Sequence, residues 1–204
     1  MENIQLPADP FGKIALSCSG GGYRAASFHL GSMSYLNRLQ FAGIPLLERV
    51  KLISAVSGGS ITGVVYALMK QEGSTFDQVY NFLLERLVSV DLLHAGIQKL
   101  NPDANWPYLF KRKNLINVFA DQYDQVFTHG ALMGVFDEMK SHLEAVVFNC
   151  TEFEHGLNFR FRNTGWRYSG NYYNRIPARL LREVKLSDVM ASSSCFPGGF
   201  EPMC

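Results

Sequence analysis

The sequence predicts an α/β fold in which a mostly parallel sheet lies between layers of helices, a three-layer α/β/α arrangement. Residues 13–17 and 50–56 are short apolar runs of the kind that form buried strands, and each ends in a turn rich in glycine and serine. A stretch with helical spacing of apolar residues follows each turn. The order strand, turn, helix, twice in succession, predicts parallel strands with helices on both faces of the sheet.

The helices after these two turns differ in their patterns. Residues 23–39 carry apolar side chains at helical spacing, and Gly43 and Pro45 end the pattern. Residues 60–70 are mostly apolar, which predicts a helix that is buried.

The middle of the chain alternates between helical and irregular patterns. Residues 75–97 predict one or two amphipathic helices, with Thr75 as the N-cap. The helical pattern degrades over residues 101–117, where two prolines stand among aromatic and basic residues. A helix is predicted again over residues 130–142.

The last third of the chain predicts two strands and a short helix. Residues 145–150 are an apolar run typical of a strand, and residues 157–162 alternate apolar and basic side chains as a half-exposed strand does. Ser187 is predicted to cap a helix that reaches Ser194, and Pro197 ends it. No repeat or linker divides the chain, so residues 1–204 are expected to form a single domain.

The balance of charge argues against a nucleic-acid partner. The chain has 19 basic and 18 acidic side chains and a net charge of +1, without the basic footprint that nucleic-acid binding leaves. Its apolar stretches are shorter than the roughly 20 residues of a membrane-spanning helix, and its N-terminus lacks a secretory signal pattern. We therefore expect the protein to meet lipid, if at all, from the water side.

Four cysteines are spread along the chain without the spacing of metal ligands. They are Cys18, Cys150, Cys195 and Cys204. We expect reduced thiols, which are typical of a cytoplasmic protein, and no metal site. No organic cofactor is expected either.

Ser57 lies between a predicted strand and a predicted helix, in the sequence Ala55-Val56-Ser57-Gly58-Gly59. A serine nucleophile needs an exposed position on a sharp turn, and the turn needs small residues two positions before and after the serine. Ala55 and Gly59 fill those positions. An ordinary loop with a serine N-cap would give the same pattern, so the motif alone leaves both interpretations open.

The first predicted strand ends in three glycines, residues 20–22, followed by Arg24. Successive glycines at the start of a helix allow backbone N–H groups to converge on an anion. A nucleotide phosphate loop is the rival interpretation. It is disfavoured because Ala25 stands where the dinucleotide fingerprint needs glycine and because the Gly-Lys-Ser/Thr pattern is absent.

Together the two motifs resemble the patatin-like phospholipases. The segment SGGGYRAASFHLG is similar to their oxyanion-hole loop, and SAVSGGSITG is similar to their nucleophile elbow. Further on, VVFNCTEFEHGLNFRFRN resembles the family strand with Asn-x-Thr, and LSDVMASSSCFPGGFEP resembles the segment that lies shortly before the catalytic aspartate. The resemblance runs from Lys13 to Pro202, with Ala25 and Ala55 in places where the family has glycine.

The resemblance implies a lipid acyl hydrolase of the phospholipase or lysophospholipase type, which cleaves carboxylic esters. Ser57 would be the nucleophile, and the N–H groups of Gly21 and Gly22 would form the oxyanion hole. Arg24 would support the loop or contact a lipid phosphate. The implied partners are lipid or phospholipid and, through them, the periphery of a membrane. The alternative is an inactive patatin-like module that binds lipid or another protein.

Patatin-like enzymes use a Ser–Asp dyad whose aspartate stands in Asp-Gly-Gly or Asp-Gly-Ala. This sequence contains no Asp-Gly. We therefore expect an N-terminal fragment of a longer enzyme, with the domain incomplete at its C-terminus and this chain inactive by itself. A natural inactive variant is the alternative.

Other general bases have weaker support in the sequence. Asp188 follows Ser187 at a predicted helix start, where an acid favours the helix dipole. The five histidines allow a Ser-acid-His triad, but none has flanking residues that support the role. Residues 83–113 are interpreted as core packing and a solvated basic turn, with a cap or an interfacial lipid contact as the alternative.

Overall fold

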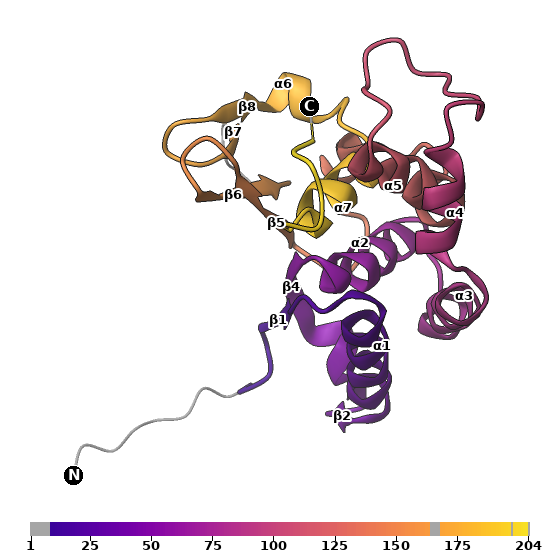
Figure 1. Cartoon of the computed structure of the whole chain (residues 1–204). Helices are drawn as coiled ribbons and strands as arrows, with labels where there is room; N and C mark the ends of the chain where they lie inside the picture. Colours follow the sequence, from indigo (N-terminus) through magenta and orange to yellow (C-terminus); the bar gives the residue numbers. More distant parts are fainter. Residues whose placement is uncertain (1–8, 164–167, 197, 204) are drawn as a thin grey trace.

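The computed structural model describes residues 9–163, 168–196 and 198–203, and its centre is a six-stranded mixed sheet (Figure 1). The first three strands along the sheet are parallel, and the remaining pairs are antiparallel. In spatial order the strands are β1 (Ile14–Cys18), β4 (Val50–Val56), β5 (Ala145–Glu152), β6 (Leu157–Arg162), β7 (Tyr168–Gly170) and β8 (Arg175–Pro177). A small hairpin of β2 (Gln40–Phe41) and β3 (Ile44–Pro45) stands apart.

Seven α-helices are described. They are α1 (Gly22–Arg38), α2 (Gly58–Gln71), α3 (Phe76–Ser89), α4 (Leu92–Lys99), α5 (Leu115–Tyr123), α6 (Ala178–Leu181) and α7 (Leu186–Ser194). Short 3₁₀ turns cover Leu46–Arg49 and Met133–Phe136, and a π-helical turn, Asp124–Thr128, continues α5.

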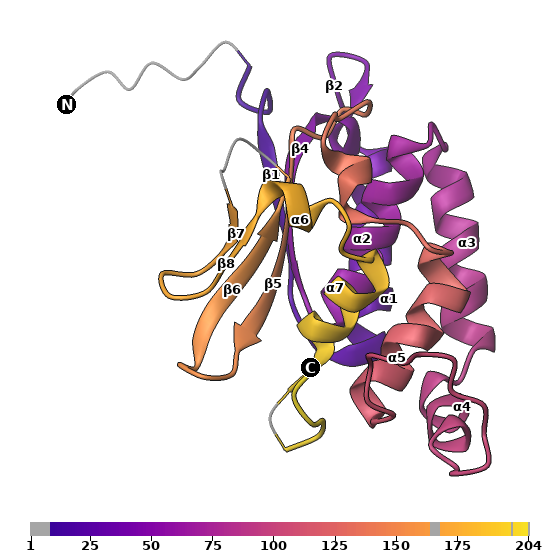
Figure 2. The same cartoon turned by 90° about the horizontal axis from the view of Figure 1, so that it is seen from above.

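The described helices gather on one face of the sheet (Figure 2). The strand order β1, β4, β5 moves in one direction across the sheet, and right-handed crossovers then place their helices on the same side. The α/β fold class is confirmed, and the parallel strands β1, β4 and β5 lie side by side at one end of the sheet. The expected helices on the second face do not occur among the residues that the structure describes.

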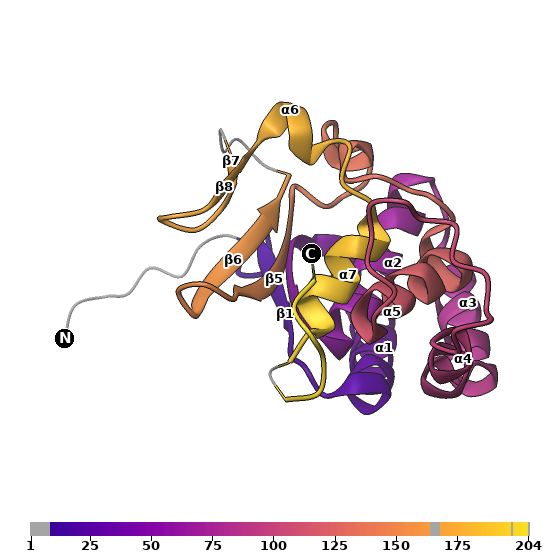
Figure 3. The same cartoon turned by 45° about the horizontal axis from the view of Figure 1, so that its top comes forward.

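Helix α2 is the centre of the core. Nearly all of its residues are buried, and it packs against β4, α1, α3 and α7. Helix α7 lies between β5 and α5 (Figure 3). The Thr62 hydroxyl of α2 donates to the Ala26 carbonyl of α1 at 2.8 Å, which ties together the two helices that follow the glycine-rich turns.

Most predicted elements in the first and last thirds of the chain are confirmed. The two N-terminal strands and the helices after them agree with β1, β4, α1 and α2 to within about two residues. The region 75–97 forms two helices, and Thr75 caps the first one in a capping box with Gln78. The strands predicted at 145–150 and 157–162 are β5 and β6.

The helix predicted over 130–142 is wrong. The helix lies earlier, in α5 and the π-helical turn, and it ends where His129 and Gly130 have φ angles of 47° and 83°. The Asp124 carboxylate accepts the Gly130 N–H at 2.8 Å and stabilises that end. The chain then pairs with the segment before α7, since Leu132 and Lys185 form an antiparallel bridge.

The predicted N-cap at Ser187 is also wrong. Helix α7 begins at Leu186 with Lys185 as its N-cap, so Ser187 lies inside the first turn and is buried. Pairing of the preceding backbone with residues 131–134 fixes this earlier start. Pro197 and Cys204 lie outside the described residues.

Candidate active site

Ser57 connects β4 to α2 in a strained backbone conformation. Its φ is 53° and its ψ is −125°, a combination that residues with a side chain seldom adopt. Two other non-glycine residues have positive φ among the described residues, Ala42 and His129. Ala42 lies beside Gly43 in the turn of the β2–β3 hairpin, and His129 ends a helix, where left-handed residues are common. Ser57 has no such local explanation, and strain of this kind occurs at strand-to-helix nucleophile turns.

The turn leaves no room for side chains after the serine. A Cβ on Gly58 would lie 2.1 Å from the Gly22 carbonyl oxygen, and a Cβ on Gly59 would lie 2.3 Å from the Cys18 carbonyl oxygen. These are contacts with backbone, which cannot rotate away. The residue types at both positions are therefore set by the close approach of the two glycine-rich turns.

Ala55 belongs to the same close packing. It is buried, and its Cβ would lie 2.9 Å from a Cβ added at Gly63 in α2. A small residue at position 55 and glycine at position 63 thus allow β4 and α2 to approach each other.

The glycine-rich turn after β1 passes over Ser57. A Cβ on Gly20 would lie 3.1 Å from the Ser57 Cβ. Gly21 and Gly22 have φ angles of 137° and 61°, which a side chain would strain, although the space around Gly22 is open. Conformation, and not crowding, therefore requires glycine at position 22.

The start of this turn is held by His29, a residue that sequence reasoning left without a role. His29 is buried in α1, and its Nε2 lies 3.0 Å from the Ser19 carbonyl oxygen. The contact fixes the chain immediately before the three glycines.

Ser193 of α7 holds the Ser57 turn from the other side. Its Oγ accepts the Ser57 N–H at 2.8 Å and donates to the Asn149 carbonyl of β5 at 2.6 Å. The Ser60 Oγ lies 2.8 Å from the same hydroxyl. Ser193 is buried, so these hydrogen bonds are shielded from water.

Asn149 completes the connection to β4. Its side-chain amide donates to the Ser54 Oγ at 3.0 Å and to the Ala55 carbonyl at 3.1 Å. The two C-terminal segments quoted from the sequence therefore meet at the Ser57 turn. The sequence placed them in order but gave no sign that Asn149 and Ser193 would be in contact.

A cavity of about 540 Å³ lies beside these turns. Ser57, the two glycines at positions 21 and 22, and aromatic side chains line it. Its lining is mostly apolar, and the lining residues are Gly21, Gly22, Ser57, Gly58, Ile61, Phe119, Tyr123, Ser194, Phe196 and Phe200. The Tyr123 hydroxyl lies 3.2 Å from the Ser194 Oγ, and burial raises the pKa of this tyrosine, so it stays neutral. The aromatic wall from α5 and the C-terminal segment was not foreseen in the sequence.

Comparison with known proteins identifies the family of the chain. The sequence model of patatin-like phospholipases matches residues 16–203. The chain belongs to the patatin-like phospholipase family. A solved structure of human GIVD cytosolic phospholipase A2, in complex with the inhibitor methyl gamma-linolenyl fluorophosphonate and terbium chloride, has a similar fold, with a TM-score of 0.59 and 14% identity. The match covers 91% of this chain and 30% of that one. No curated protein sequence matches the chain.

This member of the patatin-like phospholipase family has an exposed Arg24. The side chain stands in the first turn of α1, and it makes no hydrogen bond or ion pair with any described residue. Of the two roles implied by the resemblance, the supporting contact to the loop is not formed among the described residues.

No carboxylate or imidazole among the described residues forms a hydrogen bond with Ser57. Asp188 pairs with Lys111 at the other end of α7, five residues or about 7.5 Å along the helix from Ser193. Of the histidines, His142 pairs with Glu48 and His155 with Glu152. The Ser-acid-His alternative therefore has no partner for Ser57 in this part of the chain.

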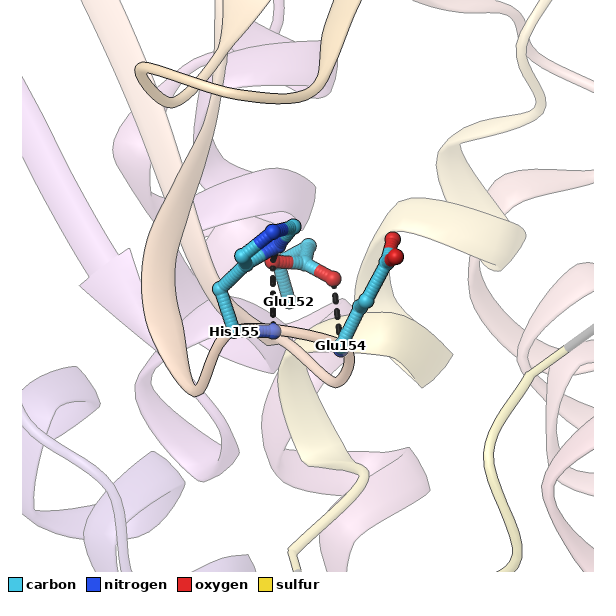
Figure 4. A group of neighbouring side chains, drawn as sticks. All are labelled: Glu152, Glu154 and His155. Carbon is cyan, nitrogen blue, oxygen red and sulfur yellow. Dashed lines mark hydrogen bonds and ion pairs between the residues drawn. The ribbon is translucent and has the colours of Figure 1, made fainter.

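A separate cluster joins Glu152, Glu154 and His155 at the β5–β6 turn (Figure 4). One ligand atom from each lies within 4.8 Å of the others. The Glu152 carboxylate accepts the Glu154 N–H at 2.6 Å and both the His155 N–H and Nδ1, at 3.2 and 3.0 Å. These bonds account for the cluster as a local turn, which needs no ion.

Among the described residues no helix is long and apolar enough to cross a membrane.

Proposed function

We propose that this chain carries the nucleophile and the oxyanion hole of a lipid acyl hydrolase that cleaves carboxylic esters. The observation that carries the proposal is the strained Ser57 turn, which faces a cavity shared with Gly21 and Gly22. Family membership supports lipid esters as the substrate class.

In the proposed reaction the Ser57 Oγ attacks the acyl carbonyl carbon and its proton passes to an aspartate. The carbonyl oxygen becomes an oxyanion, and the N–H groups of Gly21 and Gly22 stabilise it. Collapse of this intermediate expels the alcohol, which takes up the proton and leaves an acyl-enzyme. Water then attacks the acyl-enzyme, releases the fatty acid and restores the serine.

The cavity suits the acyl part of the substrate. Ile61, Phe119 and Phe200 give it an apolar wall beside the serine. An apolar acyl chain placed there would be removed from water, a gain of about 0.8 kcal/mol for each buried methylene. Arg24 would contact the phosphate of a phospholipid headgroup near the same turn.

The aspartate of the dyad is proposed to lie beyond Cys204, in an Asp-Gly-Gly or Asp-Gly-Ala segment of a longer protein. Two observations support this: no described carboxylate contacts Ser57, and the chain spans about 30% of the cytosolic phospholipase structure that it matches. The first of them also favours the second candidate function, an inactive patatin-like module that binds lipid or a partner. The natural coding sequence after Cys204 distinguishes the two.

The proposed partner is lipid, met at the periphery of a membrane from the cytoplasm, with no metal, organic cofactor or nucleic acid. The thiols of Cys18, Cys150 and Cys195 are unpaired by disulfides, which supports a reducing compartment.

A fluorophosphonate probe tests the serine directly. We expect the protein from the complete coding sequence to be labelled at Ser57 and to hydrolyse a phospholipid, and Ser57→Ala to lose both. The 204-residue chain alone should turn over p-nitrophenyl butyrate at least about 100-fold more slowly, because a general base is missing. Ser192→Ala is the matched control: Ser192 lies in α7 like Ser193 and Ser194 but outside the lining of the cavity, so this variant should keep labelling.

An adduct on a serine other than Ser57 would contradict the assignment of the nucleophile. Rapid turnover by the 204-residue chain, lost in Ser57→Ala, would show that the base lies within this sequence. Absence of hydrolysis in the complete protein would favour the inactive module.

A further inference from the structure

The loop between α4 and α5 carries two neighbouring apolar side chains that are almost completely exposed, Leu109 and Phe110. We call these two residues the tip of the loop. Leu109 is 93% exposed and Phe110 is 96% exposed, the highest values among the large apolar residues that the structure describes. Single exposed apolar residues are common on proteins. Two large apolar side chains that stand next to each other and both face water form a contiguous apolar surface, which is typical of an interaction site.

Anchors on both sides hold this tip outward. The Trp106 Nε1 donates to the Lys111 carbonyl at 2.8 Å, which closes the loop across the tip. The Tyr108 hydroxyl donates to the buried Asp121 at 2.6 Å, and the Lys111 ammonium pairs with Asp188. Tyr108, immediately before the tip, is thus fixed to α5, and Lys111, immediately after it, is fixed to α7. These two contacts hold the tip in its exposed position.

The neighbouring charge is positive. Arg112 is exposed and makes no hydrogen bond or ion pair with a described residue through its guanidinium. The Lys113 ammonium contacts the Asn101 and Ala104 carbonyls, and no carboxylate pairs with it in the described part of the chain. Residues 101–113 contain three basic side chains and one acid, Asp103.

The tip lies at the same end of the molecule as the cavity. In Figure 2 the carboxyl ends of β1 and β4, helix α4, the α4–α5 loop and the C-terminal segment all lie at the lower end. The loop runs directly into α5, whose Phe119 and Tyr123 line the cavity. Helix α4 adds Leu93 and Ile97, one turn apart and more than half exposed, at this same end.

We propose that Leu109 and Phe110 insert into the interface of an anionic lipid bilayer, with Arg112 and Lys113 against its headgroups, and so bring the Ser57 cavity to the membrane surface. An apolar tip followed by two cations that no described carboxylate neutralises matches what interfacial binding requires. The purpose of this binding, to bring the Ser57 cavity to its substrate, rests on the proposed lipid acyl hydrolase. The binding itself can be measured with vesicles, without hydrolysis.

The test uses the protein from the complete coding sequence, in a Ser57→Ala background so that vesicles stay intact. Co-sedimentation is measured with phosphatidylcholine vesicles, with and without phosphatidylserine. The double variant Leu109→Ser/Phe110→Ser should bind at least about tenfold more weakly to both vesicle types, since it loses two inserted apolar side chains. Arg112→Gln should weaken binding about fivefold only where phosphatidylserine is present.

The matched control removes two exposed apolar side chains elsewhere. Ile44→Ser/Leu180→Ser changes the β2–β3 hairpin and α6. In Figure 2 β2 and α6 lie away from the lower end, so this variant should leave vesicle binding unchanged. With Ser57 restored, the Leu109→Ser/Phe110→Ser protein should hydrolyse soluble p-nitrophenyl butyrate normally but vesicle phospholipid at least about tenfold more slowly.

Unchanged vesicle binding by a folded Leu109→Ser/Phe110→Ser protein would overturn the proposal and leave the tip as a contact for a protein partner. Equal losses in the control variant would overturn it as well, because binding would then follow general surface apolarity. If the wild-type protein hydrolyses no ester but the tip variant still loses vesicle binding, the proposed hydrolase fails and the membrane surface stands.

Discussion

The Ser57 turn and the α4–α5 loop lie at the same end of the molecule, but different forces hold them. At Ser57 backbone packs on backbone, with hypothetical Cβ atoms on Gly58 and Gly59 only 2.1 and 2.3 Å from carbonyl oxygens. In the α4–α5 loop, side chains such as Tyr108 and Lys111 reach back to α5 and α7 and hold the tip away from the core. The Ser57 turn is held by backbone contacts, so one added methyl group should destabilise it. The tip of the α4–α5 loop is held by side chains outside it, so substitutions of Leu109 and Phe110 should leave the fold intact.

The largest effect is expected from Gly58→Ala. The new methyl group would collide with the Gly22 carbonyl oxygen and force the two glycine-rich turns apart. We expect a loss of about 3 kcal/mol in the free energy of unfolding, measured by urea denaturation, and loss of fluorophosphonate labelling.

Gly31→Ala is the matched control for this substitution. Gly31 lies within α1, with nothing within 4 Å of an added Cβ, so alanine should stabilise the protein by up to about 1 kcal/mol. If the Gly58→Ala protein is as stable as the control, the Ser57 turn can make room for a methyl group. Its backbone packing would then be no more restrictive than the side-chain anchoring of the α4–α5 loop.

The next effect is expected from Ser193→Ala. The change removes the acceptor of the Ser57 N–H and the donor to the Asn149 carbonyl, both in a buried position. The free energy of unfolding should fall by about 1–3 kcal/mol, and the rate of fluorophosphonate labelling should fall more than about tenfold as Ser57 relaxes from its strained φ.

Ser192→Ala serves again as the control, because the Ser192 hydroxyl donates only to the Met203 sulfur. If both alanine variants lose stability but neither changes the labelling rate, Ser193 supports the fold without positioning Ser57. Restoration of labelling by Ser193→Thr would support the positioning role, since threonine keeps the hydroxyl.

The smallest effect concerns Asp124, whose carboxylate ties the end of the π-helical turn to Lys185 before α7. Burial would raise the pKa of its carboxyl, but hydrogen bonds from Lys185, the Gly130 N–H and Thr128 lower it below its ordinary value. A carboxyl with a lowered pKa in the folded state binds fewer protons than in the unfolded state, so its contribution is present above about pH 4 and is lost as the pH falls through the folded pKa.

Asp124→Asn should therefore cost less than about 1 kcal/mol at pH 7 and make the thermal unfolding midpoint less sensitive to acid than in the wild type. Asn has nearly the same shape and keeps an acceptor for the Gly130 N–H, so the test isolates the charge. An unchanged acid dependence would mean that other carboxyls carry it and that Asp124 does not anchor this region electrostatically.

Local patterns in the sequence predicted much of the fold. The alternation of apolar runs with glycine- and serine-rich turns predicted β1, α1, β4 and α2, because the pattern and its turn chemistry lie within neighbouring residues. The helix predicted over 130–142 failed for the opposite reason. Helix α5 is short and follows an irregular loop, and its end is fixed by Asp124 and by pairing with the segment before α7.

For the candidate site, the sequence by itself predicted the serine, the glycines and their order, since a strand-to-helix turn is built from adjacent residues. Only the tertiary structure decided that Ser193 and Asn149, far apart in the chain, hold the Ser57 turn, because their hydrogen bonds depend on how α7 packs on β5. The same holds for the aromatic wall from α5 and for the exposed tip at Leu109 and Phe110. An apolar residue in the sequence can be either buried or exposed in the folded protein. Which of the two occurs depends on how the helices and strands pack, and the local sequence does not show this.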